Sequence, residues 1–140
     1  MSRPSQTQYG FTLIEVIVIG LVMAALAGLA LTALYQTKTT TGTFTTAPAT
    51  VPAGGSANFT FNMSESFIGR TTPISGRTIT FRVEPAGILT VTPASGATNA
   101  SGDFTVAVGS PNIEYVYGGN IWATDTVSGA VEGPIHFDVR

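Results

Sequence analysis

The sequence predicts an α+β chain, in which a long N-terminal hydrophobic α-helix is followed by an all-β, antiparallel sandwich. Residues 11–34 are almost all Leu, Ile, Val, Ala, Met or Gly, and they contain no proline. From Ala57 onward, short segments alternate between apolar and polar residues and recur about every 8 to 12 residues. Pairs rich in glycine and serine separate these segments, which is typical of turns. The predicted parts are a leader (1–10), a helix (11–36), a linker or first strand (37–52) and a head (53–140).

Composition excludes several classes of function. The chain has 140 residues, of which 44% are hydrophobic and 10% are charged, whereas about 25% is usual in soluble domains. The net charge is -2 and the six basic residues are scattered, so no surface for nucleic acid is evident. The absence of cysteine excludes disulfides and thiolate metal sites.

The apolar run is long enough to cross a membrane. Its 24 residues would form a helix of about 36 Å, and a bilayer core is about 30 Å thick. A cleaved secretory signal is one alternative, but its apolar core would be only about 7–15 residues long. A plain transmembrane anchor is another, but it leaves Glu15 unexplained, because an unpaired carboxylate near the membrane costs free energy.

Residues 1–35 resemble the type IV pilin family and its type II secretion pseudopilin relatives. The resemblance is carried by a short polar leader, the motif Gly10-Phe11-Thr12-Leu13-Ile14-Glu15, and the continuous apolar run after it. It implies that a prepilin peptidase cleaves between Gly10 and Phe11 and N-methylates Phe11. It also implies that Glu15 pairs with the amino terminus of Phe11 on a neighbouring subunit, so that the two residues set the register of a helical filament.

The segment from Thr37 to Val51 is rich in threonine and has two interpretations. Threonine favours strands, which would make this segment the first strand of the head. Gly42, Pro48 and Pro52 instead favour an extended connector. A connector would join the helix flexibly to the head.

Alternation in the head predicts which side chains form its core. One face of each predicted strand is apolar, and the opposite face carries Thr, Arg, Glu, Asn or Asp. Residues 115–117 and 120–126 are predicted to pair around a turn at Gly118-Gly119. The clearest inward-facing residues are Phe59, Phe61, Met63, Ile79, Phe81, Val83, Phe104, Val106, Val108, Ile135, Phe137 and Val139.

The head also resembles the bacterial immunoglobulin-like (Ig-like) modules of adhesins. The segments that carry this resemblance are Val51–Gly55, Pro73–Gly76 and Thr98–Phe104, each of which precedes a predicted core strand. The usual pilin head, a four-stranded sheet packed on the helix, is the alternative.

No pattern in the chain predicts catalysis, so we expect neither an enzyme nor a cofactor. His136 is the only histidine, and it alternates outward beside Asp138, which is too small a set of ligands for a metal site. Trp122 has two interpretations, as a core residue or as part of an exposed interface.

The expected function is therefore structural. The main hypothesis is a subunit of a type IV pilus or a similar extracellular filament, with prepilin peptidase, an assembly platform in the inner membrane and other copies of the chain as partners. The precursor would lie in the inner (cytoplasmic) membrane and the assembled filament at the cell surface. The alternatives are a minor pilin or pseudopilin and, in another class, a membrane-anchored Ig-like adhesion module that does not polymerise.

Overall fold

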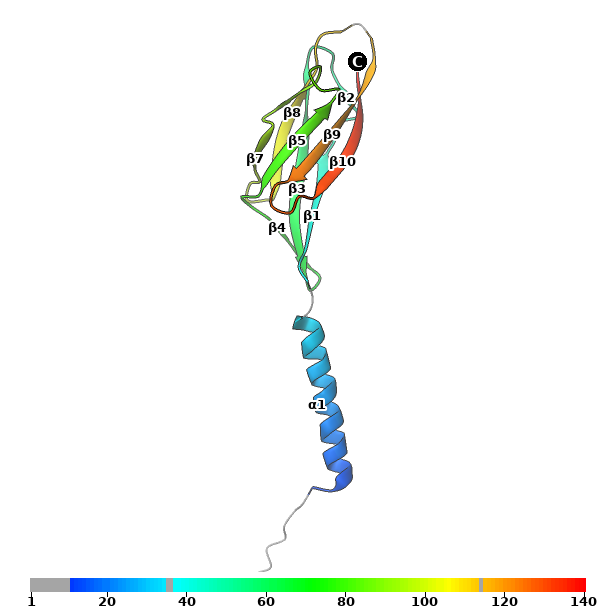
Figure 1. Ribbon diagram of the computed structural model, residues 1–140, viewed down its shortest axis with the longest axis vertical. Coiled ribbons are helices and arrows are strands. Elements are labelled where there is room, and N and C mark those ends of the chain that lie inside the picture. The colour runs from blue at the N-terminus through cyan, green and yellow to red at the C-terminus, as the bar shows by residue number, and fades with distance from the viewer. Residues whose placement is uncertain (1–10, 35–36, 114) are drawn as a thin grey trace, which may run out of the picture. The chain divides into compact units, whose positions relative to one another are not determined.

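The computed structural model describes residues 11–34, 37–113 and 115–140. The chain forms two compact units, which divide between Thr37 and Lys38. The first contains a single helix, α1 (Leu13–Leu34), and the second is an all-β sandwich (Figure 1). The predicted fold class, an apolar helix followed by a mostly antiparallel sandwich, is confirmed.

Two five-stranded sheets make up the sandwich. Within them, the pairs between named strands are antiparallel except for β2 with β10. The first sheet has the order β1 (Thr39–Thr46), β3 (Ser56–Phe67), β8 (Asp103–Gly109) and β6 (Thr90–Thr92), and β4 (Arg70–Pro73) pairs with β3. The second sheet has the order β2 (Thr50–Val51), β10 (Val131–Val139), β9 (Tyr117–Asp125), β5 (Thr78–Glu84) and β7 (Ser95–Ala97).

The core lies between the two sheets and includes ten of the twelve residues that alternation predicts. Phe59 from the first sheet packs against Phe137 from the second, with 5.3 Å between ring centroids. Phe61 from the first sheet and Phe81 from the second meet edge to face, with 6.1 Å between ring centroids. Phe104 and Ile135 are only partly buried against this core. The buried apolar residues are Val51, Phe59, Phe61, Met63, Ile79, Phe81, Val83, Leu89, Val106, Val108, Ile121, Ala123, Phe137 and Val139.

The threonine-rich segment belongs to the sandwich. The linker alternative for residues 37–52 is wrong, because these residues contain β1 and β2, and the head extends back to Lys38 rather than beginning at residue 53. The physical reason is that β-branched threonines favour strands and that Phe44 supplies an apolar anchor. Phe44 lies opposite Phe61 on β3, and their ring centroids are 5.2 Å apart.

The predicted turn at Gly118-Gly119 is also wrong, because both glycines lie inside β9. The neighbouring strand β10 places the rings of His136 and Phe137 directly over these glycines, which leaves no room for a side chain there. A Cβ atom on Gly118 would lie 2.6 Å from His136 Cε1, and one on Gly119 would lie 2.5 Å from the Phe137 ring. In this strand the glycines therefore mark a close approach of side chains and not a change of direction.

Trp122 is not a core residue. It lies half-buried on the outer face of the second sheet, between the buried residues Ile121 and Ala123. The guanidinium carbon of Arg82, its neighbour on β5, lies 4.3 Å from the centroid of the Trp122 ring. The indole is thus covered by a cation rather than by the opposite sheet.

Candidate functional site

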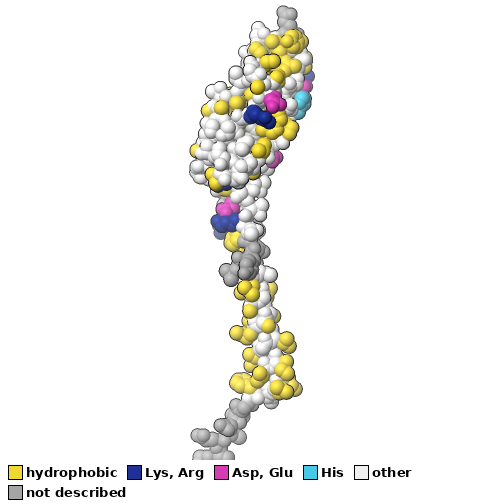
Figure 2. Space-filling view, viewed as in Figure 1, with side chains coloured by type: hydrophobic (Ala, Val, Ile, Leu, Met, Phe, Trp, Pro, Cys, Tyr) yellow, Lys and Arg dark blue, Asp and Glu magenta, His cyan; other side chains and the backbone are white. Residues whose placement is uncertain are grey.

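Helix α1 exposes a long apolar surface. It has 22 residues, which corresponds to a length of about 33 Å, and its stretch Leu13–Thr32 is long and apolar enough to span a membrane. Its apolar side chains surround the axis and are not confined to one stripe, and more than half of the surface of each large apolar side chain from Leu13 to Leu31 is exposed. Figure 2 shows these side chains along the helix. A helix that is apolar on all sides is stable only when lipid or other protein covers it.

The first turn of α1 is closed by a reciprocal pair of polar residues. Thr12 precedes the helix, and its backbone N–H and Oγ1 donate to Glu15 Oε2 over 2.7 Å and 2.9 Å. The Glu15 N–H in turn donates to Thr12 Oγ1 over 3.3 Å. This is a capping box, which satisfies donors that the first turn of a helix otherwise leaves unpaired.

The capping box gives Glu15 a function within its own subunit. A plain anchor leaves this carboxylate without a partner between subunits, but the spacing Thr-x-x-Glu before an apolar run is itself a sign of a capping box. Phe11 lies next to the cap and is 74% exposed, and Gly10 lies outside the described residues. Cleavage after Gly10 and pairing between subunits through Phe11 and Glu15 stay predictions.

A second polar cluster lies in the head, around Asp125 at the end of β9. The Arg77 guanidinium donates to both carboxylate oxygens of Asp125, from Nε over 2.8 Å and from Nη2 over 2.7 Å. Only 2% of the Asp125 side chain is exposed. Hydrogen bonds from Arg77 hold the pKa of Asp125 well below its usual range.

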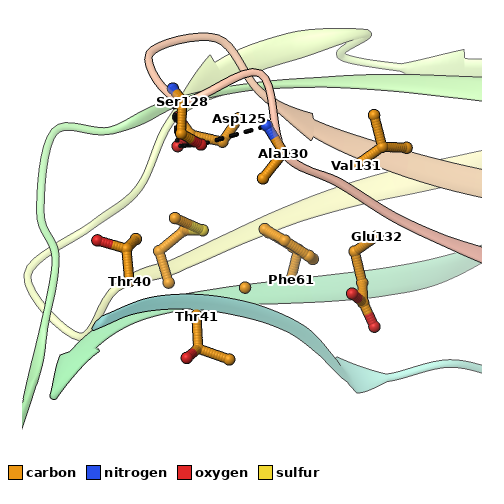
Figure 3. A pocket seen from close by; sticks show the side chains of 10 residues that line it. Thr40, Thr41, Phe61, Asp125, Ser128, Ala130, Val131 and Glu132 are labelled. Atoms are coloured by element: carbon orange, nitrogen blue, oxygen red, sulfur yellow. Dashed lines mark hydrogen bonds between the residues drawn. The ribbon is translucent and has the colours of Figure 1, made fainter.

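Asp125 also organises the hairpin between β9 and β10. Its carboxylate accepts hydrogen bonds from the backbone N–H of Val127, the backbone N–H of Ser128 and the Ser128 hydroxyl. Figure 3 shows Asp125 and Ser128 together at one side of a pocket whose opposite side includes Thr40 and Thr41. Because its oxygens already have these partners, Asp125 serves as a structural anchor rather than as a reactive group.

The pocket beside Asp125 is small. Its volume is about 200 Å³, and pockets for drug-sized ligands are usually about 300–1,000 Å³. We assign no ligand to it.

His136 lies on an exposed strand face, as its alternation indicates. Its Nδ1 is 3.2 Å from Asn120 Oδ1, and its Nε2 is 3.8 Å from Asp138 Oδ1. Across the residues that the structure describes, no three His, Asp or Glu side chains are grouped closely enough to hold a metal ion.

Comparison with known proteins bears on the head. No family model matches the chain, and no curated protein matches it. The head superposes on the C-terminal 282-residue fragment of intimin with a TM-score of 0.54 at 14% identity. That fragment was solved in complex with the intimin-binding domain of its translocated receptor. The alignment covers 72% of this chain and 33% of that fragment. A second solved structure, the adhesin InvE of Yersinia pseudotuberculosis, matches with a TM-score of 0.49 at 20% identity, over 74% of this chain and 32% of that one.

The head has an Ig-like fold. At 14% identity the likeness to the intimin fragment establishes the architecture alone, and this chain corresponds to about a third of that fragment's length. The predicted Ig-like head is thereby confirmed, and the alternative of a four-stranded pilin sheet packed on the helix is wrong, because the head is a two-sheet sandwich. The resemblance of residues 1–35 to type IV pilins stays a prediction.

Proposed function

We propose that this chain displays an Ig-like domain at the cell surface and is held there by α1 in a membrane. The observation that supports this most is the division of apolar residues between the two units. Each of the 14 residues of the buried core belongs to the sandwich, from Val51 to Val139. The head therefore completes its own core, and the apolar surface of α1 is left for lipid.

The displayed domain has the architecture of an adhesion module. The intimin fragment, which shares this fold, was solved bound to a domain of its receptor. By analogy of fold, we assign the head an adhesive role towards another macromolecule. The pocket beside Asp125, at about 200 Å³, is smaller than usual small-molecule sites, which agrees with binding through a surface.

Display can be tested with single cysteines, because the natural chain has none. Ile88, which is 49% exposed in the segment between β5 and β6, is replaced by cysteine in one variant, and Ala25 of α1 is replaced in a control. Intact cells are treated with a maleimide that does not cross the cytoplasmic membrane. The Ile88→Cys protein should be labelled in intact cells and the Ala25→Cys protein only after detergent is added. Labelling of Ile88→Cys only after lysis would show that the head is not displayed.

A second candidate function is favoured by the motif at the start of α1. In this function the chain is the subunit of a type IV pilus or a related filament, and anchored display is the stage before assembly. Helices that are apolar on all sides can pack together and cover one another in a filament core. A minor pilin or pseudopilin would use the same step but would be a scarce component of the filament.

The filament function predicts a defined amino terminus. Intact-mass measurement of the protein from its native cells should give a chain that begins at N-methylated Phe11. An unprocessed terminus at Met1 would exclude this function without affecting the anchoring role of α1.

The variant Glu15→Gln serves as the matched control for assembly, because glutamine also closes a capping box but carries no charge. If Glu15 pairs with the amino terminus of a neighbouring subunit, Glu15→Gln should reduce the yield of sheared filaments while the head stays folded. Normal filaments from Glu15→Gln would leave Glu15 with its capping role only.

A further inference from the structure

The hairpin between β3 and β4 extends beyond β8 and β6 of its sheet. Strand β3 pairs with β8 only as far as Asn62, and its last residues pair with β4 and with the start of β1. Its tip is the turn Phe67-Ile68-Gly69-Arg70. Figure 1 shows the hairpin projecting from the end of the sandwich.

The backbone of this tip is unfavourable for the residue that it carries. Ile68 has φ of 49° and Gly69 has φ of 70°, which is the two-residue turn that Asn-Gly favours. A β-branched residue at positive φ is a genuine outlier. Ile68 is nevertheless present and 59% exposed, beside Phe67 at 38%. Backbone strain that persists at an exposed position is a sign of function.

Cationic side chains flank the apolar tip. Arg70 follows the turn and is exposed, and Lys38, which is 63% exposed, forms an ion pair with Glu65 over 2.9 Å. A hollow of about 240 Å³ lies among Lys38, Glu65, Phe67, Arg70 and Thr72. Apolar residues at a tip with the cation Arg70 directly behind them match a lipid interface, where acyl chains begin just below anionic phosphates.

The tip lies at the end of the head where the chain enters its first strand. Lys38 follows Leu34 by four residues, so an extended connection spans at most about 14 Å. Thr39, the next residue, pairs with Ser66, one residue before Phe67. If α1 ends at the membrane surface, the tip is within reach of that surface. Thr90 lies at the opposite end of the sandwich, because it pairs with Gly109, which also pairs with Ser56 at the start of β3.

We propose that the Phe67–Arg70 hairpin tip is a second membrane contact, in which Phe67 and Ile68 enter the lipid interface and Arg70 meets the lipid phosphates. This inference rests on the proposed anchoring by α1. The contact would fix the end of the head that faces the bilayer and leave the opposite end free for a partner.

The test uses the full chain in vesicles of phosphatidylcholine and phosphatidylglycerol that contain a spin-labelled quencher lipid. An environment-sensitive fluorophore is attached to Thr71→Cys beside the tip, to Thr90→Cys at the opposite end, or to Ala25→Cys in α1. The two threonines are matched because both are exposed strand residues. The spin-labelled lipid should strongly quench the fluorophore at position 71 (the Thr71 probe) and leave the fluorophore at position 90 (the Thr90 probe) unquenched.

A second variant separates contact from folding. Ile68→Asn in the Thr71→Cys chain should bring quenching down to the level of the Thr90 probe. It should raise the unfolding temperature, because asparagine adopts positive φ more readily than isoleucine. The proposal fails if quenching of the Thr71 probe equals that of the Thr90 probe or survives Ile68→Asn. It also fails if the Thr71 emission shifts without quenching, since protein would then cover the tip.

The Ala25 probe distinguishes failure of the hairpin contact from failure of the α1 anchor. Quenching of the Ala25 probe without quenching of the Thr71 probe would overturn the hairpin contact and leave the anchor intact. An unquenched Ala25 probe would overturn the anchor and with it the hairpin contact.

Discussion

Replacing Asp125 with alanine is expected to lower the free energy of unfolding of the head by about 3 kcal/mol, the lower end of the cost of breaking a buried ion pair. The substitution leaves the Arg77 guanidinium without its bidentate partner, and only 22% of that side chain is exposed. It also removes the acceptor for the backbone of Val127 and Ser128. Trp122, the only tryptophan, can report unfolding of the head by its fluorescence in urea.

A matched control is Glu84→Ala. Glu84 pairs with Arg82 over 3.3 Å, but both side chains are about half exposed or more, and such surface pairs contribute about 0–1 kcal/mol. The urea midpoint should therefore change little. An Asp125→Ala protein as stable as Glu84→Ala would show that the cluster does not hold the hairpin.

The pH dependence of the stability of the head is an independent test of the cluster around Asp125. The folded-state pKa of Asp125 is depressed below its unfolded value, so its stabilising contribution is fully present above the unfolded pKa. The contribution is lost as the pH falls below that value, because the unfolded chain then binds a proton that the folded chain does not. The urea midpoint of the natural protein should fall with decreasing pH in this range more steeply than that of Asp125→Ala.

Local pattern was sufficient to predict much of the sandwich. The inward positions of β3, β5, β8 and β10 follow from strict alternation of apolar and polar residues. Each of these strands presents one face to the core and the other to solvent, so the period of two is visible in the sequence. The long apolar helix was equally visible, because its composition leaves no other stable structure.

Features that depend on a neighbouring strand could not be predicted. Gly118 and Gly119 look like a turn until His136 and Phe137 are placed beside them. Arg77 and Asp125 are 48 residues apart, and nothing local marks them as partners. The strained turn at Ile68 was missed for another reason, since isoleucine does not indicate a turn.

At the start of α1, the sequence motif indicates the important residues but only one of the two roles of Glu15. Glu15 was singled out as a charge in need of a partner. The structure provides that partner three residues earlier, at Thr12. The capping box could have been read from the sequence, whereas cleavage at Gly10 and filament assembly need evidence from other molecules.

Two pairs of valines allow a matched test of whether α1 holds the head at a membrane. Val18 and Val22 lie in α1, and Val127 and Val131 are exposed in the head at 69% and 59%. Each pair is changed to arginine. In α1 the two charges should cost up to about 5–7 kcal/mol of membrane insertion, since one arginine at a helix centre costs about 2.5–3.5 kcal/mol. In the head the same charges remain in water.

The measurement is flotation of alkaline-washed membranes on a density gradient, which separates membrane-inserted chains from free protein and from filaments. The natural chain and the Val127→Arg, Val131→Arg protein should float with the membranes. The Val18→Arg, Val22→Arg protein should stay at the bottom of the gradient. Flotation of that helix variant to the same extent as the natural chain, or failure of the natural chain to float, would show that α1 is not the membrane anchor.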